Sequence, residues 1–276
     1  MTEIQNVAGT AFIVAQLRAA ELAQARPLYR DTVVPLFLGP DTEAAAARFS
    51  KAFPPMEKTI RLRTRYFDDR LDEALERGCS QVVILGAGLD TRAIRKQRPG
   101  TLYFEIDDGA TLNFKKAQLE ANYNLSNIKF ISADYVKDGL TRLLAQNGFD
   151  TSRRTHFIWE GNTMYLTEES IRQTFLDITD NVKEFTLSFD YMTDAVIAKT
   201  TGDPAVTRLA ESFAAMGAPW TYGFASLRKF FYGSGLKIVS DVKIGELHCA
   251  FWPGEPLDSA IYEHYHLCTL ESQRVE

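Results

Sequence analysis

The sequence predicts an α/β protein with a mostly parallel, seven-stranded sheet, an antiparallel C-terminal pair of strands and a helical N-terminal cap. Three features predict it. The chain is helical in pattern up to residue 79, short apolar runs then alternate with helical stretches, and two strands follow the last helix in succession. Such alternation is typical of a parallel sheet with helices on both faces. We expect one compact unit in which residues 1–79 form a cap or lid, residues 80–276 form the core, and residues 203–221 are a lid insertion.

The cap is expected to contain three helices. The first covers Val7–Arg26, and the segment Pro35–Pro40 then breaks the chain. Asp41 is a suitable N-cap for a short second helix. The third helix covers Met56–Gly78, and its final glycine is placed to end it.

Five short apolar runs are the expected parallel strands. The first, Gln81–Gly86, is continuously apolar and ends in glycine, which suits a strand buried on both faces. The others are Thr101–Ile106, Asn127–Ser132, Thr155–Glu160 and Glu184–Tyr191. The helical stretches between them are Thr91–Gln97, Asp108–Tyr123, Asp138–Gln146 and Thr167–Asn181.

The C-terminal part has a different pattern. After the insertion at 203–221, Ala225–Gly233 is expected to be a helix. Leu236–Ile244 and Ser259–Leu270 are expected to be strands, and the stretch Gly245–Glu255 between them is expected to be a loop. Because no helix is expected between these strands, they should pair in antiparallel fashion.

Composition excludes several classes of protein. The formal net charge is −5, so the surface offers no general attraction for a nucleic acid, which usually requires a basic face. Cys79, Cys249 and Cys268 are far apart in the sequence, so we expect neither a disulfide framework nor a metal site. The N-terminal stretch lacks the pattern of a signal peptide or a membrane span. These features favour a cytoplasmic protein without a membrane partner.

A glycine turn after the first strand is the strongest local motif. Gly86-Ala87-Gly88 joins a buried strand directly to a helix, and its glycines let the backbone approach a ligand closely. The dinucleotide fingerprint would continue with a third glycine or alanine, but position 91 is Thr. This absence disfavours a pyrophosphate cofactor.

Acidic residues follow the next three strands. Asp107 ends the second strand and is placed to accept hydrogen bonds from ribose hydroxyls, whereas Glu105 is a candidate for holding the glycine turn. Asp134 ends the third strand, where it is expected to accept from an adenine amino group that Tyr135 flanks. Glu160 ends the fourth, where the amino group of a methionine moiety is expected. Helix capping is the alternative role for Asp107 and Asp134, and a structural role is the alternative for Glu160. A ligand that has all of these groups is S-adenosylmethionine (SAM), with S-adenosylhomocysteine (SAH) as its product.

Together these motifs resemble the leucine carboxyl methyltransferase family, and in particular its bacterial biosynthetic branch, which is similar to polyketide carboxyl O-methyltransferases. The resemblance covers roughly residues 7–195 and is carried by RTRYFDD, GAGLDTR, FEID, SADY and WEGNTMYLTEESI. It implies a Rossmann-like, seven-stranded class I methyltransferase sheet, SAM as methyl donor and, usually, a carboxylate oxygen as acceptor. It further implies that Arg63 binds the SAM carboxylate, that Gly86, Asp107, Asp134 and Glu160 have the roles given above, and that Tyr165 lies on the substrate side. Protein-modifying members carry an arginine two residues after the adenine-side aspartate, where this chain has Val136. This departure favours a small-molecule acceptor.

The acceptor group decides which catalytic residues are required. A carboxylate is already ionised and needs only an anchor, for which Tyr165, Tyr191 and Arg92 are candidates. A phenol or alcohol needs a base, for which His248 is the candidate. Six aromatic residues either line an acceptor pocket or belong to the core: Trp220, Tyr222, Phe224, Phe230, Phe231 and Tyr232. A catalytically silent SAM-binding scaffold and a nicotinamide-dependent oxidoreductase are the remaining alternatives. The sequence leaves the acceptor and the oligomeric state open.

Overall fold

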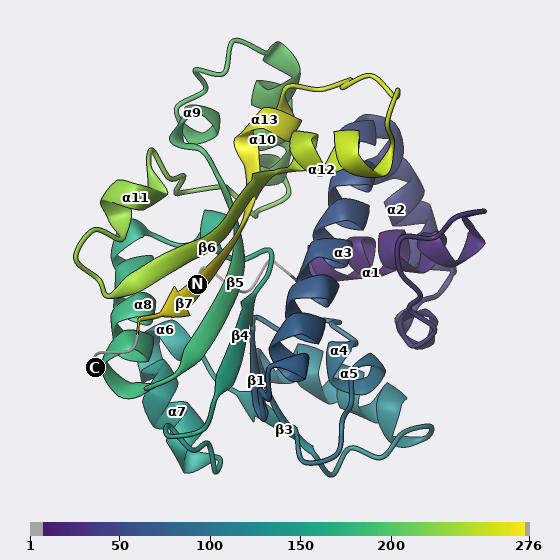
Figure 1. The fold of residues 1–276 in the computed structure, drawn as a ribbon. Coiled ribbons are helices and arrows are strands. Elements are labelled where there is room, and N and C mark those ends of the chain that lie inside the picture. Colours follow the sequence, from purple (N-terminus) through teal and green to yellow (C-terminus); the bar gives the residue numbers. More distant parts are fainter. Residues whose placement is uncertain (1–7, 274–276) are drawn as a thin grey trace.

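A seven-stranded sheet runs through residues 8–273, the part of the chain that the computed structural model describes (Figure 1). Its order is β3-β2-β1-β4-β5-β7-β6. The strands are β1 (Gln81–Leu85), β2 (Leu102–Asp107), β3 (Ile128–Ser132), β4 (Thr155–Trp159), β5 (Phe185–Met192), β6 (Leu236–Lys243) and β7 (Tyr265–Ser272). The first five pair in parallel, whereas β7 is antiparallel to both β5 and β6. The predicted fold class is therefore confirmed.

Helices cover both faces of the sheet. Figure 1 shows α1, α2 and α3 on one side, and α6, α7, α8 and α11 on the other. The cap and first-half helices are α1 (Ala8–Ala20), α2 (Pro40–Ala52), α3 (Pro54–Glu76), α4 (Arg92–Arg95), α5 (Gly109–Glu120), α6 (Tyr135–Asp138) and α7 (Leu140–Gln146). The second-half helices are α8 (Glu168–Asn181), α9 (Asp194–Ile197), α10 (Pro204–Ala215), α11 (Leu227–Phe230), α12 (Ile244–Phe251) and α13 (Ile261–His264). Short 3₁₀ turns lie at Glu21–Ala23, Val34–Phe37 and Thr163–Tyr165.

Helix α3 fixes the cap to the sheet. It packs against β4, β5 and β7, and its Leu62, Phe67 and Leu71 are fully buried. Each such side chain contributes about 1.5–3 kcal/mol of burial free energy. Gly78 ends this helix as predicted, with a φ of 84° and the paired backbone hydrogen bonds of a Schellman motif. The helix therefore holds Arg63, which lies on it, in a fixed position above the sheet.

Two details of the predicted cap are wrong. Helix α2 begins at Pro40, with Gly39 and not Asp41 at the N-cap, because proline is well suited to the first helical position. Helix α1 ends at Ala20, before the predicted Arg26, and Val7 lies outside the described residues. The chain turns there because the buried Glu21 carboxylate accepts from the backbone N–H of Leu28.

Two C-terminal predictions are also wrong. The expected loop at Gly245–Glu255 is largely helix α12, and the strand expected from Ser259 begins only at Tyr265, after the short helix α13. His264 therefore ends a helix, while His266 lies on β7. Within residues 8–273, no helix is long and apolar enough to cross a membrane.

Candidate functional site

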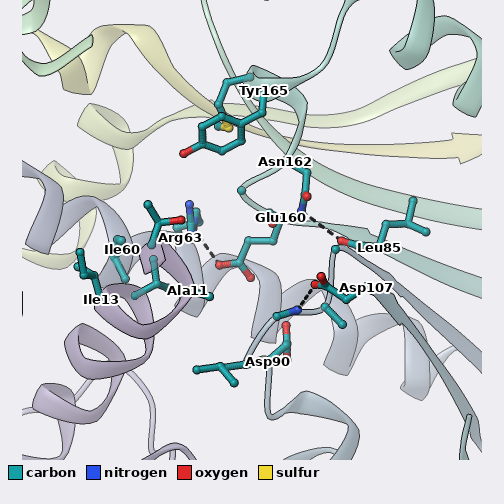
Figure 2. A pocket seen from close by; sticks show the side chains of 18 of the residues that line it. Ala11, Ile13, Ile60, Arg63, Leu85, Asp90, Asp107, Glu160, Asn162 and Tyr165 are labelled. Carbon is teal, nitrogen blue, oxygen red and sulfur yellow. Dashed lines mark hydrogen bonds and ion pairs between the residues drawn. The ribbon is translucent and has the colours of Figure 1, made fainter. Parts of the chain in front are cut away.

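A cavity lies at the carboxyl ends of β1, β2 and β4, where the strand order reverses direction (Figure 2). Open parallel sheets bind ligands at this kind of position. The cavity brings together the glycine turn, the ends of β2 and β4, and side chains from α1, α2, α3 and α10. Of the residues predicted to bind or act on a ligand, it is lined by Arg63, Gly86, Ala87, Gly88, Asp107, Tyr135, Glu160 and Tyr165.

The glycine turn is closely packed at the floor of this cavity. Gly86 has a φ of 61° and Gly88 a φ of 44°, a backbone region that side chains rarely adopt. A Cβ atom on Gly86 would lie 2.2 Å from Oδ1 of Asn162, and one on Gly88 would contact Ala11 of α1. The turn therefore fits closely against β4 and the cap.

Gly86→Ala is expected to cost about 2–4 kcal/mol of unfolding free energy, because the left-handed backbone and the contact with Asn162 both penalise the new methyl group. Gly148→Ala is a matched control. Gly148 has a φ of 85°, but nothing lies within 4 Å of the added Cβ, so only the backbone penalty of about 1 kcal/mol should remain. Urea denaturation of both variants checks this. Equal losses of unfolding free energy in the two variants would show that the contact with Asn162 does not penalise a side chain at Gly86.

Asp107 holds the turn from the end of β2. Its Oδ2 accepts from the backbone N–H of Gly88 at 2.5 Å, and its Oδ1 accepts from that of Asp108 at 2.7 Å (Figure 2). Burial raises the pKa of the Asp107 carboxyl to about 6, although these two hydrogen bonds oppose the shift. The sequence suggested Glu105 for holding the turn, but Glu105 is fully buried and forms an ion pair with Lys115 at 2.6 Å.

The end of β3 matches the prediction only in part. Tyr135 lines the cavity and its hydroxyl accepts from the indole N–H of Trp159 at 2.9 Å. Asp134 does not line the cavity. It caps α6 by accepting from the backbone N–H groups of Val136 and Lys137. In the structure Asp134 is therefore the N-cap of α6, which is the alternative role given above.

Glu160 is surrounded by arginines. Its Oε1 accepts from Arg18 at 2.6 Å and from Arg63 at 2.8 Å, and its Oε2 accepts from Arg92 at 2.6 Å. Burial raises the pKa of Glu160, but the charges of Arg18, Arg92 and Arg63 outweigh burial and hold that pKa well below its ordinary value. Glu160 is therefore ionised, and its hydrogen-bonding capacity is largely used within the protein.

Two of these arginines also face the cavity. Arg63 donates from Nη1 to Asp190 and to the Tyr265 hydroxyl, while its Nη2 donates to no described group. Arg18 of α1 likewise lines the cavity, and no described group accepts from its Nη1. Arg65, two positions further along α3, points elsewhere and pairs with Asp69. The free N–H groups of Arg18 and Arg63 can donate to a ligand carboxylate, which guanidinium binds well.

Arg92 lies beneath the cavity and does not line it. It is fully buried, and it forms ion pairs with Asp68 at 2.7 Å, Asp90 at 2.5 Å and Glu160 at 2.6 Å. Burial lowers the pKa of Arg92, but these three carboxylates raise it well above its ordinary value. The acceptor-anchoring role suggested for Arg92 is therefore excluded by its position, and Arg92 joins α3, the glycine turn and β4.

Apolar and aromatic side chains line the other end of the cavity. Tyr165 follows β4, and burial raises the pKa of its hydroxyl to about 12, with Trp220 and Arg63 opposing the shift. Trp220 and Phe213 come from the 203–221 segment and pack together with ring centroids 4.7 Å apart. Tyr222 and Phe224 pack in the core beneath α8 and α11 instead. Of the six suggested aromatic residues, Trp220 lines the cavity, whereas Tyr222, Phe224, Phe230, Phe231 and Tyr232 do not.

Tyr191 and His248 lie outside the cavity. The Tyr191 hydroxyl donates to Asp241 at 3.0 Å and lies 3.0 Å from Nδ1 of His266, on the antiparallel part of the sheet. His248 is buried on α12, where its ring stacks on Tyr262. The structure does not bring either side chain to the ligand-binding region.

A model of the leucine carboxyl methyltransferase family matches residues 11–179, which include the glycine turn and the ends of β2, β3 and β4. The chain belongs to this leucine carboxyl methyltransferase family. Among similar sequences are proteins of Mycobacterium tuberculosis and Frankia alni whose names suggest SAM-dependent methyl transfer. The first is 35% identical over 191 residues, covering 63% of this chain and 57% of that protein. The second is 34% identical over 184 residues, covering 62% of this chain and 63% of that protein.

Solved structures share the fold of this leucine carboxyl methyltransferase family member. A DUF574 family protein from Streptomyces avermitilis has a TM-score of 0.67 at 15% identity, covering 94% of this chain and 96% of that one. Magnesium protoporphyrin IX methyltransferase from Synechocystis with bound SAH has a TM-score of 0.50 at 12% identity, covering 83% and 94%. These likenesses concern the fold alone.

Sequence reasoning did not find Arg18 and Asn162, which both line the cavity. Arg18 lies 142 positions from its partner Glu160, and no local motif marks it. Asn162 lies in the motif WEGNTMYLTEESI, which predicted roles for its neighbours Glu160 and Tyr165. The available signal was a polar amide residue two positions after Glu160, just ahead of the stretch Met164–Leu166.

Proposed function

We propose that this chain is a SAM-dependent methyltransferase that methylates a carboxylate of a small molecule. One observation supports it most. A single cavity has the Asp107 carboxylate beside the glycine turn and the free guanidinium N–H groups of Arg18 and Arg63 further along. Carboxylates accept from ribose hydroxyls, and guanidinium groups bind carboxylates. SAM carries both groups: ribose hydroxyls in its nucleoside part and a carboxylate at its amino-acid end.

The residues of the cavity fit this cofactor. Asp107 would bind the ribose, Tyr135 would lie beside the base, and Arg18 and Arg63 would hold the amino-acid carboxylate. Gly86 and Gly88 lie in the wall of the cavity, where their missing side chains let Asn162 and Ala11 pack against the turn. When bound, SAM supplies a methyl group on a positively charged sulfur atom.

The residues that line the cavity favour a carboxylate over a phenol as the methyl acceptor. No histidine among residues 10–273 lines the cavity. Four carboxylates do: Asp90 and Glu160 are paired with arginines, Asp107 holds the glycine turn, and Asp108 caps α5. The Tyr165 hydroxyl is neutral at physiological pH because its pKa is raised, so it can donate a hydrogen bond but cannot act as a base. An acceptor that is already ionised needs no base.

The chain's contribution to the reaction is then alignment and exclusion of water. Holding two reactants in attack geometry can contribute about 7–11 kcal/mol. We propose that Tyr165 orients the acceptor, and that α1 with the 203–221 segment forms a lid, since Ala11, Ile13, Phe213 and Trp220 from these segments all line the cavity.

Two measurements test this function. Calorimetry should show binding of SAH and no binding of NAD. Methyl transfer from labelled SAM should then be detected with members of a panel of small carboxylic acids and not with matched phenols. Transfer to phenols alone would contradict the proposed acceptor, and binding of NAD alone would contradict the cofactor.

Tyr165→Phe is expected to raise the KM for the acid acceptor about tenfold, which corresponds to one hydrogen bond of about 1.4 kcal/mol. Its affinity for SAH should stay unchanged, because Tyr165 lies at the acceptor end of the cavity. For the same variant, steady-state kinetics measures the KM for the acid and calorimetry measures the affinity for SAH. Weaker SAH binding with an unchanged KM for the acid would place Tyr165 on the cofactor instead.

A further inference from the structure

We propose that Asn162 positions the methionine end of the cofactor, with its side-chain carbonyl accepting a hydrogen bond from the cofactor's α-ammonium group. The inference rests on the proposed function. It gives the ammonium a partner other than Glu160, the acid at which the family resemblance places it.

The Asn162 amide is fixed by the sheet. Its Nδ2 donates to the backbone carbonyl of Leu85 at 3.2 Å and to that of Glu160 at 2.7 Å. These carbonyls lie at the carboxyl ends of the neighbouring strands β1 and β4. The opposite orientation of the amide would turn an oxygen toward two carbonyl oxygens, so Oδ1 must point away from them. The strand ends thus determine where this acceptor lies.

The fixed oxygen lies over the glycine turn and has no partner among the described residues. It is 2.2 Å from the place where a Cβ on Gly86 would stand, and Asn162 lines the cavity. Figure 2 shows Asn162 between Tyr165 and the Leu85 carbonyl, next to Glu160. A carbonyl that is held in place without a donor favours a ligand that supplies one.

Glu160 has little capacity left for an ammonium group. Three guanidinium N–H bonds, from Arg18, Arg63 and Arg92, already occupy its two oxygens and balance its charge. Bringing a further cation to this carboxylate would place it against three positive charges. Asn162 offers an unoccupied acceptor on the side of the glycine turn, away from those guanidinium contacts.

The test is calorimetry with three ligands. SAH carries the ammonium group, its deaminated analogue lacks only that group, and 5′-methylthioadenosine lacks the whole amino-acid end. Asn162→Val is expected to weaken SAH binding about 10- to 100-fold, the range for one hydrogen bond to a charged group. Binding of the deaminated analogue and of 5′-methylthioadenosine should stay as in the wild type.

Asn162→Asp separates this role from a purely structural one. Aspartate keeps an acceptor but loses the donor to Leu85 and Glu160, so it should bind SAH more tightly than the valine variant does. If the role of Asn162 were purely structural, Asn162→Asp would weaken SAH binding at least as much as Asn162→Val does. Binding of all three ligands would then weaken alike. Either of those results, or unchanged SAH binding by Asn162→Val, would overturn the inference. A wild-type protein that binds neither SAH nor 5′-methylthioadenosine would instead overturn the proposed function.

Discussion

Arg92→Met is expected to lower the free energy of unfolding by about 3–5 kcal/mol, the range for removing one partner from a buried ion pair. Arg92 is completely buried, and its guanidinium group contacts Asp68, Asp90 and Glu160 at 2.5–2.7 Å. Methionine fills much of the same volume but leaves these carboxylates with fewer cations. Asp68 retains Arg95, and Glu160 retains Arg18 and Arg63, whereas Asp90 keeps no described ion-pair partner.

The loss of unfolding free energy in Arg92→Met should depend on pH. Burial raises the pKa of Asp68, but Arg92 and Arg95 outweigh it and lower that pKa to about 2; Glu160 is shifted in the same direction. A lowered carboxyl pKa contributes stability above the unfolded value of about 4, and this contribution is lost as the pH falls toward the folded value. The difference between wild type and Arg92→Met should therefore be largest near neutral pH and shrink below about pH 4.

Urea denaturation over a pH series measures this difference. Lys116→Met is the control, because Lys116 and its partner Glu120 are both about half exposed and such pairs contribute about 0–1 kcal/mol. Arg92→Lys should be intermediate, since an ammonium group cannot contact three carboxylates with the planar geometry of guanidinium. A loss for Arg92→Met no larger than that for Lys116→Met would show that the cluster does not stabilise the fold.

The sequence predicted the fold well because its signals are local. The first four parallel strands are short runs followed within two residues by glycine or an acidic residue, and the observed strands β1 to β5 lie within a few residues of the predicted ones. The errors occur where local signals conflict. Gly245 and Pro253 indicated a loop around His248, but Ile244 and His248 are buried against α3 and α13, and this packing favours helix α12.

Of the three strand-end acids predicted for the site, Asp107 and Glu160 line the cavity and Asp134 does not, and the residues that distant segments contribute were missed. Asp107 and Glu160 follow directly from strand positions. The partners of Glu160 come from residues 68, 97 and 142 positions away in the sequence, and no pattern links them. His248 was considered because of its chemistry alone, and its location on α12 could not be read from its neighbours.

Asp107→Asn is expected to weaken SAH binding about 100-fold, which corresponds to losing about 3 kcal/mol of charged hydrogen bonding to the ribose hydroxyls. An amide has one carbonyl oxygen, whereas the carboxylate uses one oxygen for Gly88 and the other for Asp108 and still has lone pairs left for a ligand. Calorimetry at neutral pH measures this effect. Asp177→Asn, on the far α7–α8 surface, is the control and should bind SAH as the wild type does.

The same substitution should also change how the stability of the ligand-free protein depends on pH, because burial raises the pKa of Asp107 to about 6. A raised carboxyl pKa contributes stability below the unfolded value of about 4, and that contribution is lost as the pH rises through the folded value. Ionisation of Asp107 therefore costs up to about 3 kcal/mol between pH 4 and pH 7, so the melting temperature of the wild type should fall relative to that of Asp107→Asn over this range. Wild-type affinity for SAH should fall below pH 6 toward that of the variant, since protonation removes the same acceptor. If the variant melts lower than wild type at pH 7 and still binds SAH equally well, Asp107 is a structural residue of the glycine turn and the ribose must bind elsewhere.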